Sequence, residues 1–159
     1  MSSQPPVVGL QPVGRDNWRA CVALGVAKHQ RQFVSPVHRY LNLCAYGGTP
    51  WHPLAVEVDG SIVGFAMWAI DPDDGSYWIG GLVIDTPHQG KGYGRATVRE
   101  LIAMAVAGGH PSVGLSYSEA NVAAKALYAG LGFVGTDEQV DGETVARLVL
   151  ARGPARPGP

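Results

Sequence analysis

The sequence predicts an α/β fold built on one mixed sheet, and three observations point to it. Predicted strands and helices follow one another in the order βααβββαβαββ. Residues 54–58 and 61–70 are two strand-like segments joined by Asp59-Gly60, which indicates a hairpin. Residues 76–84 form an apolar strand that leads through a glycine-rich turn into a helix, and a helical crossover joins parallel strands. We therefore expect antiparallel and parallel pairs in one sheet, with helices on both faces.

The N-terminal part of the chain is predicted to supply one strand and two helices. Residues 7–13 form a short strand whose prolines suit an edge position. Asp16 or Asn17 is a suitable cap for the first helix. Ser35-Pro36 places a cap and a first-turn proline at the start of the second helix, which two glycines end. The two helices are expected at residues 17–29 and 36–46.

Turn residues bound the remaining elements. The helix after the glycine-rich turn is expected from about Tyr93 to Ala107, because Gly108-Gly109 and a proline follow it. Beyond it we expect a strand at 113–117, a helix at 120–129, a strand starting at 133 and a last strand at 144–150. One domain is predicted over residues 6–150, and residues 1–5 and 151–159 are predicted to be disordered tails.

Composition restricts the class of protein. The chain has 159 residues, 46% of them hydrophobic, and a net charge of −1, which is typical of a single soluble domain. This charge favours neither nucleic acid nor an anionic membrane as partner. No apolar run approaches the roughly 18 residues of a membrane span, and the N-terminus lacks an export signal, so a cytoplasmic location is expected. Cys21 and Cys44 are expected to be reduced thiols, and no metal site is predicted.

The glycine-rich turn is the strongest functional signal. Its glycines allow a close approach of the backbone to a ligand, and the following helix presents unpaired N–H groups and a positive dipole end. A phosphate or diphosphate suits such a site, and Lys91 and Arg95 add positive charge. The spacing matches neither the P-loop nor the dinucleotide fingerprint.

Two motifs resemble those of the GNAT N-acetyltransferase superfamily. Residues 89–94, Gln-Gly-Lys-Gly-Tyr-Gly, match its Q/R-x-x-G-x-G turn. Its second signature, N-x-x-A-x-x-L-Y followed by G-F, is present between Asn121 and Phe133. The element order is also that of the superfamily. The resemblance spans about residues 6–150 and implies the acyl-CoA N-acyltransferase fold.

The resemblance implies acetyl-CoA as co-substrate and a direct attack of an amine on its thioester in a ternary complex. Asn121 is expected to bind the pantetheine arm, and Tyr128 is expected to protonate the leaving thiolate as general acid. The cofactor-binding set implied in this way is Leu82, Val83, Ile84, Gln89, Gly90, Lys91, Gly92, Tyr93, Gly94, Arg95, Asn121 and Tyr128.

A general base is harder to identify. Many members of the superfamily carry an acid or His on the strand before the glycine turn, where this chain has Gly80 and no ionisable acid or His. The candidates acting through water are Glu119, Glu57, Asp71 and His52. We favour Glu119, because it ends a strand next to the expected cofactor cleft.

The expected acceptor is a primary amine of a small molecule. Several segments resemble the spermine/spermidine acetyltransferase branch, although Gly80-Gly81 stands where that branch carries Asp-Arg. The loss of those charges beside Trp78 suits a bulkier amine equally well, such as an amine-bearing antibiotic. The candidate substrate-binding residues are Trp78, Gly80, Asp71 and Glu119, with Trp51, Trp68 and Tyr77 as further aromatic candidates. A catalytically degenerate acyl-CoA sensor is the alternative function, and the resemblance leaves a homodimer open.

Overall fold

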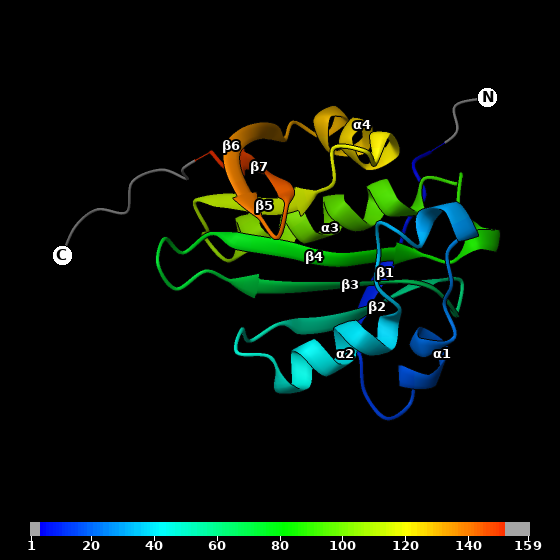
Figure 1. Ribbon diagram of the computed structural model, residues 1–159. Coiled ribbons are helices and arrows are strands. Elements are labelled where there is room, and N and C mark those ends of the chain that lie inside the picture. The colour runs from blue at the N-terminus through cyan, green and yellow to red at the C-terminus, as the bar shows by residue number, and fades with distance from the viewer. Residues whose placement is uncertain (1–3, 152–159) are drawn as a thin grey trace.

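A computed structural model describes residues 4–151, which form a seven-stranded mixed sheet with helices on both faces (Figure 1). The predicted element order and fold class are confirmed. The strands are β1 (Gly9–Pro12), β2 (His52–Val58), β3 (Ser61–Ile70), β4 (Tyr77–Ile84), β5 (Ser112–Tyr117), β6 (Val134–Val140) and β7 (Glu143–Val149). The helices are α1 (Trp18–Val22), α2 (Val37–Tyr46), α3 (Tyr93–Ala107) and α4 (Val122–Gly130), with short 3-10 turns at Lys28–Gln30 and Thr86–His88.

The sheet divides at its single parallel pair. Its strand order is β1-β2-β3-β4-β5-β7-β6, and α3 is the crossover between the parallel neighbours β4 and β5. These two strands pair only at Tyr77 with Val113 and at Trp78 with Gly114. Beyond Trp78 the ladder ends and the strands separate, which leaves the edge of β4 facing an opening in the sheet.

A β-bulge lies on β4 beside this opening. Phe65 of β3 pairs with Val83, whereas Met67, two residues later, pairs with Gly80, three residues earlier on β4. The extra residue falls next to Gly81, whose φ of +60° is a conformation that glycine adopts without strain. Because a bulge bends its strand and interrupts the ladder, this feature shapes the backbone that borders the opening.

Two apolar layers sandwich the sheet. Helices α3 and α4 cover one face, and α1 and α2 cover the other (Figure 1). On the α3 face, Val98 and Leu101 are fully buried against Tyr77. On the opposite face, Val37 packs in a cluster with Phe65. Burial of side chains of this size contributes about 1.5–3 kcal/mol each, so the two layers hold the sheet rigidly around the opening.

The first helix is much shorter than predicted. The sequence indicated a helix over residues 17–29, but α1 has only five residues. The chain leaves the helix to contact the segment after β4: the N–H of Gly25 donates to Asp85 at 2.9 Å, and the N–H of Thr86 donates to the carbonyl of Gly25 at 2.9 Å. These long-range bonds override the local helical periodicity.

The predicted capping side chains of the first two helices make no capping hydrogen bond. Asn17 occupies the N-cap position of α1, but its side chain accepts a hydrogen bond from the N–H of Gly14 and donates to the carbonyl of Pro12. It therefore closes the preceding turn, a common alternative for Asn. Pro36 occupies the N-cap position of α2 and Ser35 makes no side-chain cap.

The other boundaries differ from the predictions by no more than one or two residues at each end, and β3 and α3 match them fully. Within residues 4–151, no helix has the length and apolar character needed to cross a membrane. The predicted tails fall mainly on residues 1–3 and 152–159, outside the described part of the chain.

Candidate active site

A cleft of about 1390 Å³ opens where β4 and β5 separate. Its walls come from the loop before α2, the second half of β4, the glycine turn, the end of β5, the start of α4 and the β6–β7 turn. The volume exceeds the roughly 300–1,000 Å³ of an ordinary small-molecule site, so it suits two ligands. The predicted site residues that line it are Trp78, Gly80, Leu82, Val83, Ile84, Gln89, Gly90, Gly92, Tyr93, Gly94, Arg95, Asn121 and Tyr128.

The glycine turn forms one end of the cleft. Gly90 and Gly92 have φ values of +76° and +83°, and Gly92 is the N-cap of α3. The first turn of this 15-residue helix begins at Tyr93, so its unpaired N–H groups and the positive end of its dipole lie at the cleft. This end of the cleft has the backbone chemistry that a diphosphate requires.

The predicted polar residues of the turn have different surroundings. Gln89 donates to the carbonyl of Ile84 at 2.8 Å and pairs with the amide of Gln30 at 3.0 Å, so its side chain fastens the turn to the end of β4. Arg95 donates to the carbonyl of Gly130 at 3.1 Å, at the C-terminal end of α4. Lys91 is exposed and lies outside the lining of the cleft.

Helix α4 brings Asn121 and Tyr128 to the same cleft. Asn121 is the N-cap of α4 and accepts from the N–H of Ala124 at 3.2 Å. Tyr128 is buried between the rings of Tyr117 and Phe133, with centroids 6.1 and 5.9 Å away.

The phenol of Tyr128 is held in its protonated form. Burial raises the pKa of Tyr128 to about 12, with smaller contributions from the Glu143 carboxylate and from Tyr40. A phenol with this pKa keeps its proton across the neutral range, which is the state that a proton donor needs.

An indole fills the space above Gly80. A Cβ atom at Gly80 would lie 3.1 Å from the ring of Trp51 and 3.1 Å from the terminal methyl of Met67. Trp51 lines the cleft, as one of the predicted aromatic candidates. Trp68 and Tyr77 do not line it; they stack on each other, with centroids 5.2 Å apart. Gly80 therefore leaves room for Trp51 at the position where many members of the superfamily carry an acid or His.

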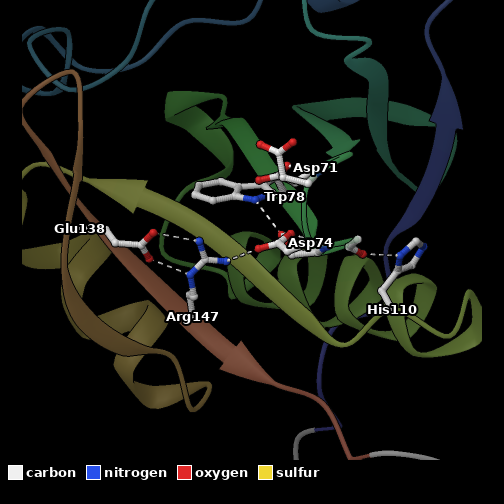
Figure 2. Close-up of polar contacts among 9 residues, drawn as sticks. Asp71, Asp74, Trp78, His110, Glu138 and Arg147 are labelled. Atoms are coloured by element: carbon white, nitrogen blue, oxygen red, sulfur yellow. Dashed lines mark hydrogen bonds and ion pairs between the residues drawn. The ribbon is translucent and has the colours of Figure 1, made fainter.

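Trp78 is held in place by a polar network (Figure 2). Its indole N–H donates to the hydroxyl of Ser76 at 3.0 Å, and that hydroxyl donates to Asp74 at 2.6 Å. The guanidinium of Arg147 lies 5.2 Å from the Trp78 ring centroid and pairs with Glu138 at 2.9 Å and Asp74 at 3.7 Å. Trp78 is thus held through its indole N–H and through its ring, and it lines the cleft.

Two predicted acids lie away from the cleft lining. Asp71 lies in the turn after β3 and accepts from the N–H of Asp73 at 2.9 Å. Glu119 is exposed, pairs with Lys125 at 2.7 Å and accepts from Thr144 at 3.0 Å. The hydrogen bond from Lys125 holds the pKa of Glu119 below its usual value. Glu119 borders a separate hollow of about 290 Å³, and its role as base stays a prediction.

Glu143 is an acid that the sequence reasoning missed. It is half-buried at the start of β7, lines the cleft, and accepts from the hydroxyl of Ser116 at 3.1 Å. Glu143 lies in residues 142–145, one of the segments that resemble the polyamine branch, but no local pattern indicated which way its side chain points.

The residues present fit acetyl-CoA. The glycine turn offers N–H donors for a diphosphate, the edge of β4 offers unladdered backbone beyond Trp78, and the cleft is long enough to continue to Tyr128. Within residues 4–151, no group of three or more His, Cys, Asp and Glu side chains has an arrangement that could hold a metal ion. Cys21 and Cys44 are free, and burial raises the pKa of Cys21 to about 11.

Comparisons with known proteins identify the family and the fold. The spermine/spermidine N(1)-acetyltransferase of Bacillus subtilis (strain 168) is 28% identical over 136 residues, covering 79% of this chain and 87% of that protein. The crystal structure of the GNAT domain of S. lividans PAT superposes with a TM-score of 0.70 at 15% identity, covering 89% of both chains. The spermidine N-acetyltransferase from Vibrio cholerae, in complex with CoA and spermine, has a TM-score of 0.67 at 20% identity, covering 88% of this chain and 92% of that one.

At these identities the solved structures establish the fold alone. The family itself is established by sequence, because the model of the acetyltransferase (GNAT) family matches residues 18–133, most of the chain. The chain therefore belongs to the GNAT acetyltransferase family and is an acetyl-CoA-dependent N-acetyltransferase.

Proposed function

We propose that this enzyme acetylates a primary amine of a small polyamine-like molecule in a ternary complex, with Tyr128 as general acid. The observation that carries the proposal is one continuous cleft that joins a diphosphate-type turn to a buried, protonated phenol and then to acidic residues. The relative in Bacillus subtilis is a spermine/spermidine N(1)-acetyltransferase. A cationic acceptor requires negative charge in its half of the cleft, and Asp141 and Glu143 supply it.

When bound, acetyl-CoA supplies an acetyl thioester, which an amine converts to an amide. In our proposal the backbone of the turn from Gln89 to Arg95 holds the diphosphate, and Lys91 contributes charge from outside the cleft. The backbone of Leu82, Val83 and Ile84 binds the pantetheine arm from one wall, and Asn121 binds it from the other. Two hydrogen bonds within the protein support these roles. The bond from Gln89 fastens the glycine turn to the end of β4, and the bond from Arg95 fastens α3 to the end of α4.

Tyr128 is the residue proposed to supply the proton for the leaving sulfur. Its hydroxyl is ionised only well above neutral pH, so the donor form is populated under working conditions. Its ring is buried and packs against the rings of Tyr117 and Phe133, which supports a defined position of the hydroxyl. Fixed geometry of this kind is what a general acid needs to act within hydrogen-bond reach.

A bulkier amine is the second candidate acceptor. Trp51 and Trp78 both line the acceptor side of the cleft, and Gly80 leaves the β4 wall without a charged side chain. Flat aromatic walls favour a large amine, such as an amine-bearing antibiotic or an aryl-alkylamine, over a thin polycation.

The deciding experiment measures coenzyme A release from acetyl-CoA with spermidine, spermine, aryl-alkylamines and aminoglycosides. We expect turnover of one class and a loss of roughly 10²–10⁴-fold in kcat for Tyr128→Phe. Tyr77→Phe is the matched control, since it also removes a buried phenol hydroxyl but lies outside the cleft lining, and it should keep wild-type kinetics. Tight binding of acetyl-CoA without turnover of any amine would instead favour an acyl-CoA sensor.

A further inference from the structure

The reaction needs a proton acceptor that β4 does not provide. An alkylamine is mostly protonated at neutral pH, so its ammonium group must lose a proton before the nitrogen can attack. At Gly80 the neighbouring space is taken by Trp51, at 3.1 Å from a built Cβ, so no side chain of β4 takes this role there. The acceptor of the proton has to come from another element of the cleft.

Two histidines and two carboxylates, side chains of the kinds that can accept a proton, line the cleft. His88 ends the 3-10 turn just before the glycine turn, and His29 is exposed next to Gln30, whose amide pairs with Gln89. Both histidines therefore lie at the diphosphate end of the cleft. The carboxylates in the described lining are those of Asp141 and Glu143.

Only one of these carboxylates is held at the end of the cleft that contains Tyr128. Asp141 is exposed in the β6–β7 turn, whereas Glu143 is half-buried. The hydroxyl of Ser116 donates to Oε1 of Glu143 at 3.1 Å, which links β7 to the end of β5. Glu143 lines the same cleft as Tyr128 and Tyr40, and its negative charge contributes to the raised pKa values of both phenols.

We infer that Glu143 is the general base of the reaction and that Ser116 positions it. This inference rests on the proposed function. The hydrogen bond to Ser116 engages Oε1, which leaves Oε2 as the oxygen that accepts a proton from the acceptor's ammonium group. Glu143 then releases this proton to solvent.

The amine nitrogen loses a second proton as it attacks, and this proton returns to Tyr128. The freed lone pair of the amine forms the C–N bond, and the C–S bond breaks with its electron pair on sulfur. Tyr128 gives its proton to the sulfur and is reprotonated by the second proton that the nitrogen loses. The products are the amide, the free thiol and one proton released through Glu143.

Glu143→Gln is the direct test, because Gln is isosteric and still accepts the hydrogen bond from Ser116. The assay uses the best acceptor of the amine panel and an analogue with fluorine atoms beside the reacting amine, which keeps that amine neutral at the assay pH. We expect a loss of roughly 10²–10³-fold in kcat on the parent amine and a much smaller loss on the analogue. Glu100→Gln, on the exposed surface of α3, is the matched charge control and should leave both rates unchanged.

A second variant keeps the test valid if Glu143→Gln folds poorly. Ser116→Ala keeps the carboxylate but removes the group that positions it, so we expect a loss of roughly threefold to tenfold in kcat with the same dependence on the acceptor. Melting temperatures of all variants separate folding defects from chemical ones.

Several outcomes would overturn the inference. An unchanged kcat for Glu143→Gln, an equal loss on both acceptors, or an increase in KM alone would each show that Glu143 is no base. A loss seen with Glu119→Gln instead would assign the role to the acid that sequence favoured. A wild-type enzyme that acetylates no amine would refute the proposed function together with this inference, whereas an active wild type with an equally active Glu143→Gln refutes this inference alone.

Discussion

A single methyl group added at Gly114 tests how tightly Trp78 is held. Gly114 lies on β5 directly beneath the indole, and a Cβ atom there would lie 2.9 Å from Cε2 and 3.0 Å from Cζ2 of Trp78. Ordinary van der Waals contact begins at 3.4 Å, so the ring has to move by about half an ångström. Because the methyl group is attached to a buried central strand, the ring and not the backbone is expected to give way.

The cost follows from the contacts that the ring would disturb. Its hydrogen bond to Ser76, at 3.0 Å, is worth about 0.5–1.5 kcal/mol. Its contact with the Arg147 guanidinium, at 5.2 Å, is worth about 0.5–1 kcal/mol. Gly114→Ala should therefore lower the free energy of unfolding by about 1–3 kcal/mol, the usual range for overpacking. For a domain of this size the melting temperature should fall by roughly 2–4 °C per kcal/mol.

Thermal unfolding and the KM for the acceptor are the measurements. We expect a lower melting temperature together with a higher KM, since Trp78 lines the cleft and is proposed to bind the acceptor. In a Trp78→Leu background the same methyl group has room, and its cost should fall by more than half. Gly9→Ala, with its nearest contact at an ordinary 3.8 Å, is the control substitution in a strand. Equal costs of Gly114→Ala in both backgrounds would refute the reasoning.

Two further predictions concern the glycine turn and the network around Trp78. Gly92→Ala should destabilise the fold by about 1 kcal/mol, because φ at Gly92 is +83° and a Cβ would lie 3.2 Å from Pro6. It should also weaken acetyl-CoA binding measured by calorimetry, and an unchanged affinity would contradict this. Asp74→Asn should lower the melting temperature near pH 6 and lower it progressively less as the pH falls below 3.8, because hydrogen bonds from Ser76 hold the pKa of Asp74 below that usual value. That stabilisation is present above the usual pKa and is lost as the pH falls through the folded-state pKa; a difference that persists at low pH would contradict it.

Local signals predicted most of the sheet because the structure uses them locally. Asp59 and Gly60 have φ values of +49° and +80°, so both central positions of the hairpin turn adopt the conformation that their residue types tolerate. The helix after the glycine turn also starts and ends where its flanking glycines indicate. The first helix failed because Gly25 bonds to Asp85, 60 residues away, and no local pattern encodes such a contact.

The candidate site also combines features that short motifs predict with contacts that they do not. The glycine turn and the helix bearing Asn121 and Tyr128 are short, contiguous motifs, so their sequence alone indicated their arrangement. The surroundings of Gln89 were not predictable, because its amide partner Gln30 lies in a loop with no regular pattern. The sequence can thus indicate a residue that lines the cleft without indicating what its side chain contacts.

The choice between Glu119 and Glu143 depends on strand order. The sequence favoured Glu119 because it ends a strand next to the expected cofactor cleft. In the structure, β7 inserts between β5 and β6, which places Thr144 opposite Tyr117 and brings Glu143 beside Ser116, 27 residues away. The same insertion brings the hydroxyl of Thr144 to Glu119. The carboxylate of Glu119 thus accepts hydrogen bonds from both Thr144 and Lys125. The pairing of β7 with β5 therefore engages Glu119 in a hydrogen bond and places Glu143 in the lining of the cleft. For this reason a base for this site can be argued only after the register of β7 is known.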